Sequence, residues 1–221
     1  MPWGVLQPVM ARVLILFAHP ALERSRVHRR LLERLPGSPD LTFHDLYEVY
    51  PRLDVDVGRE QQLLLEHDVV AFQHPFYWYS TPPILKQWQD LVLEHGWAYG
   101  SEGDALQGKT LISLISAGGG EEAYCTAGYN RFTVRQLLAP IEQTAELCGM
   151  HFLPPFVVFG THRLGDQGIP EEAERYRTLL EALLAGEPDA TERERLAGAI
   201  TINGFVSRLA SADGRGNGPG A

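Results

Sequence analysis

Short apolar runs alternate with amphipathic segments along this chain, and that alternation restricts the possible folds more than any other feature of the sequence. The run RVLILFA at residues 12–18 is almost entirely apolar, which is typical of a strand covered on both faces in a parallel sheet. A loop follows, and then SRVHRRLLERL, in which apolar residues recur at helical spacing behind Ser25, a candidate helix N-cap. The sequence therefore predicts a unit of strand, loop and helix.

This unit recurs along the chain. Further strands are predicted at residues 41–46, 69–73 and 110–116, with a fifth ending at Gly160, and helices at 60–66, 83–95, 132–148 and 171–185. Strands and helices in alternation imply right-handed crossovers and a parallel, doubly wound α/β sheet between two helical layers. Five strands suit the flavodoxin-like order 2-1-3-4-5.

The alternating pattern predicts one domain with a segment at either end. The domain spans residues 12–186, a loose extension covers 1–11, and a tail covers 187–221. The extension has no apolar segment long enough for export or for spanning a bilayer. The tail holds a short helix candidate at 191–196 and the Gly-rich end DGRGNGPGA, which we expect to be disordered.

Charge and cysteine usage narrow the function classes. The formal net charge is −9, from 28 acidic and 19 basic residues, which argues against a surface that neutralises nucleic-acid phosphates. An anionic ligand must therefore be held locally, by backbone N–H groups or a few arginines. Cys125 and Cys148 are too few for a disulfide framework or a zinc site, so we expect no metal and a cytoplasmic location.

Three loops lie where a doubly wound sheet binds ligands, outside the carboxyl ends of its strands. The first, AHPALERS, meets the N-terminus of the first helix, and His19, Ser25 and Arg26 are candidate donors to a phosphate there. Capping alone would explain Ser25 equally well, and packing at a strand end would explain His19.

The loop after the fourth strand begins Ser116-Ala117-Gly118-Gly119-Gly120. Consecutive glycines let the backbone approach a ring closely while presenting N–H groups, although a flexible turn is the alternative interpretation. The first strand is followed neither by G-x-G-x-x-G nor by a G-x-x-x-x-G-K-[ST] loop, which disfavours nucleotide hydrolysis.

The loop after the third strand, HPFYWYSTPP, contains four aromatic side chains and two prolines. Its rings are those of Phe76, Tyr77, Trp78 and Tyr79, and a packed surface loop or a dimer contact would also account for them. A phosphate site, a platform of rings and a closely approaching backbone fit flavin mononucleotide (FMN) together.

Several segments resemble the NAD(P)H:quinone oxidoreductase family of flavodoxin-like proteins, and within it the flavoprotein ancillary subunits of glutathione-gated potassium-efflux systems. They are LILFAHP, DLYEVYPRLDVD, HPFYWYSTPPILKQWQDLVLEHGWAYG, ALQGKTLISLISAGGGEEAY and CGMHFLPPF. The resemblance covers most of residues 12–160. It implies that residues 12–186 form a flavin-binding domain.

The resemblance also implies roles for individual residues. Tyr124 matches the tyrosine that lines the nicotinamide and quinone pocket, and Asn130 falls where the animal enzymes have a pocket histidine, so a proton relay through that histidine is absent. Tyr77 replaces a glutamine of close relatives. The implied flavin contacts are His19, Ser25, Arg26, Val27, His28, Phe76, Tyr77, Trp78, Tyr79, Ser116, Ala117, Gly118 and Gly119.

The activity implied by the resemblance is two-electron transfer from NAD(P)H through FMN to a quinone or a similar electrophile. FAD is the less favoured flavin, because the sequence offers no clear second site for an adenosine. A homodimer is expected from the apolar surface of residues 84–100. One alternative function is a regulator that docks on a potassium-efflux transporter at the inner face of the membrane. Another is a one-electron carrier, which is disfavoured because the aromatic loop and Tyr124 suggest a substrate pocket.

Overall fold

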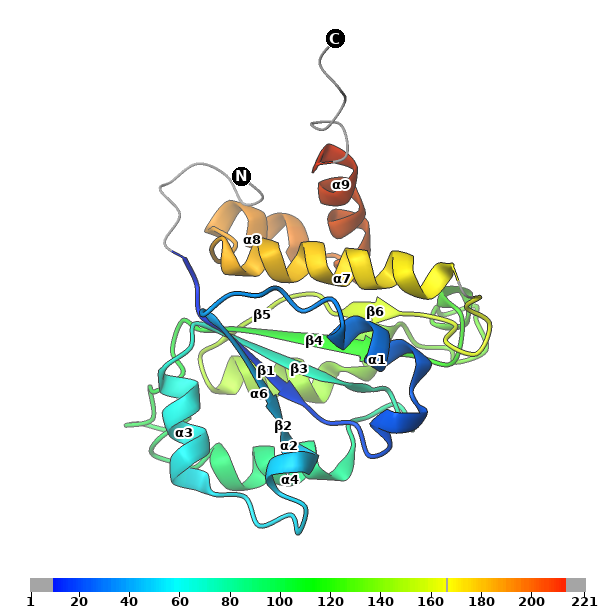
Figure 1. The fold of residues 1–221 in the computed structure, drawn as a ribbon. Helices are drawn as coiled ribbons and strands as arrows, with labels where there is room; N and C mark the ends of the chain where they lie inside the picture. Colours follow the sequence, from blue (N-terminus) through cyan, green and yellow to red (C-terminus); the bar gives the residue numbers. More distant parts are fainter. Residues whose placement is uncertain (1–9, 166, 214–221) are drawn as a thin grey trace.

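A parallel β-sheet lies between two layers of helices in the computed structural model, which describes residues 10–165 and 167–213 (Figure 1). The strands are β1 (Val13–Phe17), β2 (Leu41–Asp45), β3 (Val69–Pro75), β4 (Thr110–Ser116), β5 (His151–Phe152) and β6 (Phe156–Val158). Their order is β2-β1-β3-β4-β5, with β6 also paired to β4. The predicted flavodoxin-like fold and strand order are confirmed.

The predicted fifth strand, FVVFG at residues 156–160, is observed as β6, and the short strand β5 before it was not predicted. β5 and β6 both pair with β4, through His151 with Thr110 and Phe156 with Leu114, and the chain leaves the ladder between them. Pro154 and Pro155 lie in this interval and have no N–H to donate. The strand is therefore split at the position where the sequence removes two backbone donors.

Helices cover both faces of the sheet. One face packs on η2 (Glu121–Ala123), α2 (Leu46–Val49), α3 (Val57–Leu65), α4 (Pro83–Val92), α5 (Val134–Leu137) and α6 (Ala139–Leu147). The other packs on η1 (Leu22–Arg24), α1 (Arg26–Leu32), α7 (Gly168–Leu184), α8 (Ala190–Ala197) and α9 (Asn203–Asp213). The helix predicted at 132–148 is two helices, because Pro140 near the start of α6 interrupts the backbone hydrogen bonds.

The chain beyond residue 186 continues the second helical layer. Leu196, Ile202 and Val206 are buried in the same core as α7. Asn203 Oδ1 accepts from Val157 N at 3.0 Å and Asn203 Nδ2 donates to Val157 O at 2.7 Å, so one side chain satisfies the backbone of β6 as a neighbouring strand would. The predicted helix at 191–196 is α8, whereas α9 was not predicted. Residues 214–221 of the Gly-rich end lie outside the described residues.

A buried carboxylate ties the first helical layer together. Glu60 accepts hydrogen bonds from His44 Nε2 at 2.8 Å, Tyr50 Oη at 2.6 Å and Trp88 Nε1 at 2.8 Å. Burial alone raises the pKa of Glu60, but these donors outweigh it and hold the pKa below its ordinary value. The network joins β2, α3 and α4.

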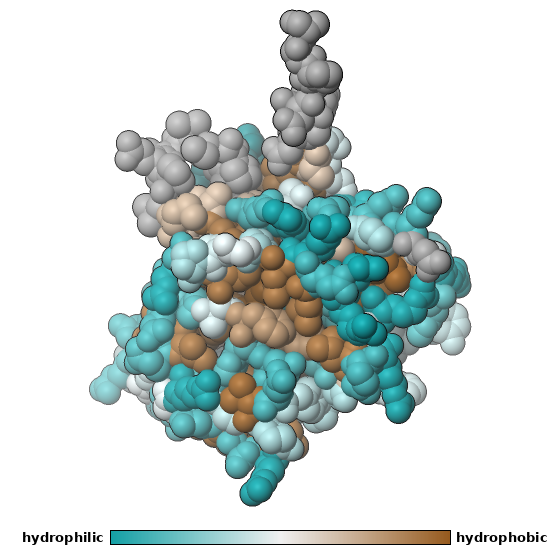
Figure 2. Space-filling model, in the orientation of Figure 1, coloured by the Kyte–Doolittle hydropathy of each residue, from teal (hydrophilic) through white to brown (hydrophobic). Residues whose placement is uncertain are grey.

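The surface is hydrophilic over most of the face in Figure 2, with apolar side chains gathered over the strands in its middle. Among the described residues, no helix has both the length and the apolar character needed to cross a bilayer.

Candidate functional site

A cleft of about 620 Å³ opens at the carboxyl edge of the sheet, where several strands end. This volume is within the range that small-molecule sites occupy. Its lining comes from four separate connections: His19, Ala21, Arg24, Ser25, Arg26 and Val27 after β1; Pro75, Phe76, Tyr77 and Trp78 after β3; Ser116 and Gly118 after β4; and Thr161 and His162 after β6.

The connection after β1 presents donors to the cleft. His19 Nδ1 accepts from Ala21 N at 3.1 Å, so the neutral ring carries its proton on Nε2, and burial lowers the pKa of His19 despite the opposing charge of Glu23. Ser25 caps α1 by accepting from His28 N at 3.1 Å, which leaves its own hydroxyl hydrogen to donate. Arg24 and Arg26 are exposed beside them. The lining here therefore suits an anion.

The floor of the cleft rests on a buried histidine. His28 Nε2 lies 2.9 Å from Ser116 Oγ, while His28 Nδ1 is buried and has no partner among the described residues. A buried N–H without an acceptor is rarer than a bare lone pair, so the tautomer with the proton on Nε2 is favoured. His28 then donates to Ser116. The Ser116 hydroxyl hydrogen is left to point elsewhere, and Ser116 lines the cleft.

Burial keeps this histidine neutral. The pKa of His28 is well below its ordinary value, first because the ring is buried and then because His19 and His74 lie nearby. His74 is also fully buried, and burial lowers its pKa to about 4. The groups beneath the cleft therefore offer hydrogen bonds rather than charge.

The aromatic loop is a tight turn. Ser80 N donates to Tyr77 O at 3.0 Å, and the two central residues have positive φ, +50° at Trp78 and +61° at Tyr79. This is the φ pattern of a type I′ turn, and it costs bulky L residues roughly 1–2 kcal/mol each. Strain of this kind concentrates at ligand sites. Trp78 is 92% exposed, so its ring stands at the mouth of the cleft rather than in the core.

The predicted catalytic pair lies beside the cleft. Tyr124 is buried, with its ring centroid 6.3 Å from that of Phe76, and Asn130 Oδ1 accepts from Tyr79 Oη at 3.1 Å. Burial raises the pKa of Tyr124, as does Tyr79, while a hydrogen bond with Asn130 lowers it. Tyr79, Tyr124 and Asn130 thus form one hydroxyl-rich cluster, which Phe76 connects to the cleft.

Two glycines after β4, Gly118 and Gly119, lie close to other side chains. Neither Gly118 nor Gly119 has a positive φ, so conformational freedom is not what they supply. A Cβ on Gly118 would lie 2.9 Å from His162 Nε2, and one on Gly119 would lie 3.2 Å from Tyr124 Cε2. Among the described residues, their N–H groups have no acceptor. The close packing of His162 and Tyr124 accounts for the missing Cβ atoms, and the two N–H groups are left to donate to a ligand in the cleft.

The predicted contacts divide into three groups. Nine line the cleft: His19, Ser25, Arg26, Val27, Phe76, Tyr77, Trp78, Ser116 and Gly118. His28 and Ala117 lie buried behind that lining. Gly119, Tyr79, Tyr124 and Asn130 lie beside it.

The sequence-based search missed Ala21, Arg24, Pro75, Thr161 and His162. Thr161 and His162 follow the last strand, whose carboxyl end lies at the same edge of the sheet. Applying the strand-end rule to that strand as well would have found them.

Comparison with known proteins agrees with this geometry. Residues 11–180 match the family described as having a flavodoxin-like fold. The chain belongs to this family. It is 45% identical to the NAD(P)H oxidoreductase YrkL of Bacillus subtilis over 171 residues, which are 77% of this chain and 98% of that protein. It is 42% identical to the glutathione-regulated potassium-efflux ancillary protein KefF of Klebsiella aerogenes over 168 residues, or 76% and 94% of the two chains.

A solved structure is similar as well. General stress protein 14 of Treponema denticola in complex with FMN has a TM-score of 0.74 and 39% identity, and the match covers 78% of this chain and 99% of that one. The resemblance stated from the sequence, to NAD(P)H:quinone oxidoreductases and potassium-efflux ancillary subunits, is confirmed.

Proposed function

We propose that this protein is an FMN-dependent NAD(P)H oxidoreductase that passes two electrons to a quinone or a similar electrophile. The observation that carries the proposal is one cleft with basic and hydroxyl groups at one side and three aromatic rings at another. The similar protein of known structure binds FMN, and the curated relative YrkL is named an NAD(P)H oxidoreductase.

The lining residues fit FMN. His19 Nε2, the Ser25 hydroxyl and the guanidinium groups of Arg24 and Arg26 are donors suited to a phosphate. Gly118 has no Cβ to obstruct a flat ring. Its N–H has no acceptor among the described residues, so it can donate to the polar edge of that ring. When bound, FMN would supply the two-electron chemistry itself.

The remaining residues orient the substrates and exclude water. Trp78 at the mouth would cover one side of the bound ring, and Tyr124 would direct a nicotinamide or a quinone through its hydroxyl group. Asn130 accepts from Tyr79 and also holds Tyr124, so its role is to position these two hydroxyl groups. None of these side chains acts as a nucleophile.

Two measurements on purified protein test the proposal. Denaturation should release FMN, identified by chromatography, and NADH or NADPH should be oxidised steadily in the presence of a soluble quinone. Release of FAD would contradict the choice of flavin. A flavin-loaded protein that transfers no electrons from either nucleotide would contradict the proposed activity.

A second candidate function is that of an ancillary subunit of a potassium-efflux transporter, located at the cytoplasmic face of the membrane. The similarity to KefF favours it, with quinone reduction then secondary. A gene for a potassium-efflux transporter beside the gene for this protein, together with a change in potassium efflux when the protein is deleted, would support this function.

We also propose a homodimer. The expectation from the sequence relied on α4, but Ile84, Leu85, Trp88 and Val92 are buried in the protein's own core. The exposed rings near the cleft, Trp78 at 92% and Tyr129 at 90%, are better candidates for the contact. A monomer by light scattering at micromolar concentration would contradict the dimer.

A further inference from the structure

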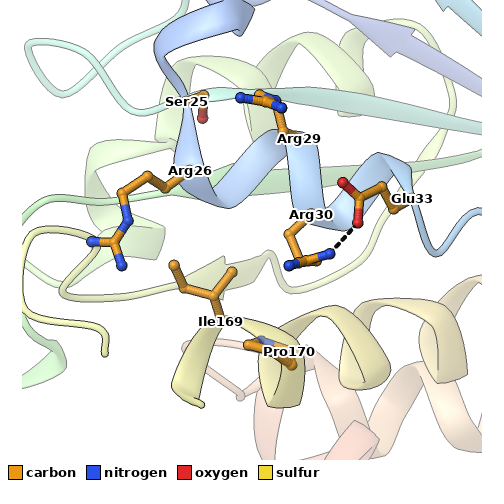
Figure 3. A pocket seen from close by; sticks show the side chains of 7 residues that line it. All are labelled: Ser25, Arg26, Arg29, Arg30, Glu33, Ile169 and Pro170. Atoms are coloured by element: carbon orange, nitrogen blue, oxygen red, sulfur yellow. Dashed lines mark hydrogen bonds and ion pairs between the residues drawn. The ribbon is translucent and has the colours of Figure 1, made fainter. Parts of the chain in front are cut away.

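A second hollow adjoins the cleft. It has a volume of about 310 Å³ and lies between α1 and the start of α7 (Figure 3). Its lining consists of Ser25, Arg26, Arg29, Arg30, Glu33, Ile169 and Pro170. Because Ser25 and Arg26 also line the cleft, the two hollows are neighbours. No second site for an adenosine is predicted from the sequence, and this hollow is a candidate for one.

The hollow is locally positive on a protein of net charge −9. Three arginines face one acid, and Glu33 already pairs with Arg30. The side chain of Arg29 has no hydrogen bond or ion pair within the described residues, and its guanidinium group is exposed. Arg29 and Arg30 follow Arg26 by three and four residues, so each of them neighbours Arg26 on the surface of α1. Positive charge therefore extends along α1 beyond what the cleft itself uses.

The opposite wall is apolar. Ile169, which is buried, and Pro170 come from the first turn of α7 and lie across the hollow from Arg26 and Arg30, whereas the Arg29 guanidinium lies near Ser25 (Figure 3). Arginine binds phosphate through two parallel N–H donors, and its planar group stacks on flat rings. An apolar wall facing several arginines suits a purine that carries a phosphate.

We propose that this hollow binds the adenosine 2′-phosphate of NADPH and selects NADPH over NADH. The proposal rests on the proposed oxidoreductase function. The two nucleotides differ only in that phosphate, so a protein that distinguishes them needs positive charge at the adenosine end of the ligand. Arg29 is the main ligand, and Glu33 weakens binding by pairing with Arg30.

Turnover with the two nucleotides gives the first test. In the wild-type holoprotein, kcat/KM for NADPH should exceed that for NADH by about tenfold or more, because hydrogen bonds between charged groups are among the stronger ones. Arg29→Ala should lower kcat/KM for NADPH by about tenfold and leave NADH within about twofold. Glu33→Gln should act in the opposite direction and raise the preference for NADPH, since it releases Arg30.

Arg34→Ala is the matched control. It removes the same charge from the neighbouring segment, but Arg34 pairs with Glu174 and does not line the hollow. Equal kcat/KM for NADH and NADPH in the wild type, or equal effects of Arg29→Ala and Arg34→Ala, would overturn the proposal. Release of FAD from the protein would also overturn it, because the adenosine of the flavin would then occupy the hollow.

A binding measurement separates this proposal from the proposed function. Calorimetry on the holoprotein should show that 2′,5′-ADP binds more tightly than 5′-AMP. The Arg29→Ala variant should lose this difference in affinity. If neither NADH nor NADPH supports turnover, the proposed oxidoreductase function is wrong. The proposed binding of a 2′-phosphate in the hollow is then tested by the affinity for 2′,5′-ADP alone. Binding that depends on Arg29 supports it, and no binding overturns it.

Discussion

In the wild type, His28 Nε2 lies 2.9 Å from Ser116 Oγ. Replacing Ser116 by alanine removes this hydroxyl group from the floor of the cleft and leaves the buried Nε2–H of His28 without an acceptor. A buried donor that loses its partner costs about 1–3 kcal/mol of stability. In a domain of this size, each kcal/mol lowers Tm by about 2–4 °C. We therefore expect Ser116→Ala to melt several degrees below the wild type, even without flavin.

The same substitution should weaken the binding of FMN. If the Ser116 hydroxyl donates to the bound flavin, its loss costs about 0.5–1.5 kcal/mol, which is about twofold to tenfold in Kd. Titration of the apoprotein with FMN, followed by flavin fluorescence, measures this change. The stability effect and the binding effect are separate, because the first is read without ligand.

A double-mutant cycle with His28→Leu tests the hydrogen bond itself. His28 is fully buried, and its other ring nitrogen has no partner among the described residues, so leucine removes a ring whose one side-chain hydrogen bond there is the bond to Ser116. Removing both partners of a buried hydrogen bond is less costly than removing one. The double variant should be more stable than Ser116→Ala alone. In the alanine background, His28→Leu should leave the Kd for FMN unchanged. Additive losses in both measurements would refute the proposed donation from His28 to Ser116.

Three further predictions follow from the same site. Tyr124→Phe should retain FMN by absorbance per protein but lower turnover about fivefold to tenfold, the equivalent of one hydrogen bond, and loss of the flavin would show that the assigned role is wrong. Gly118→Val should abolish flavin retention, because its side chain would obstruct the flat ring and displace His162 of the cleft lining, whereas Gly37→Val, with open space around it, should not; equal retention would contradict a close approach of the ring to Gly118. Stability should fall as the pH drops below about 6.5 towards 4, because His74 is neutral in the fold with a pKa of about 4, so the unfolded chain binds the proton first; a flat urea-unfolding profile over that window would argue against it.

The parts of the fold that were predicted are those in which burial on both faces leaves a continuous apolar run. β1 and β4 are buried at every residue, and the predicted strand at 110–116 is the one observed. Helix α9 was missed because NGFVSRLASAD has only three large apolar residues and gives a weak helical pattern. Its position depends on Asn203 bonding to Val157, 46 residues away, and local periodicity does not report such a contact.

The same distinction applies to the candidate site. The strand-end rule locates the loops, because topology alone brings the carboxyl ends of parallel strands to one edge. It does not say which way a side chain points. His28 and Ser116 are 88 residues apart, and their contact decides that Ser116 faces the cleft as a donor while His28 lies beneath it. Tyr79 and Asn130 are 51 residues apart, and their hydrogen bond puts both beside the cleft rather than in it.

The charged groups and the buried hydrogen-bonding groups lie on different sides of this cleft. Burial depresses the pKa values of His19 in the lining and of His28 and His74 beneath it, so these rings act as neutral donors or packing groups. The positive charge comes from arginines on the exposed rim and along α1, where water and salt have access. Attraction between exposed charges is screened over about 8–10 Å at physiological salt, whereas buried hydrogen bonds are not. Raising the ionic strength should therefore weaken binding at the arginines, and with it any preference for NADPH, while the contribution of the His28–Ser116 pair to FMN affinity stays constant.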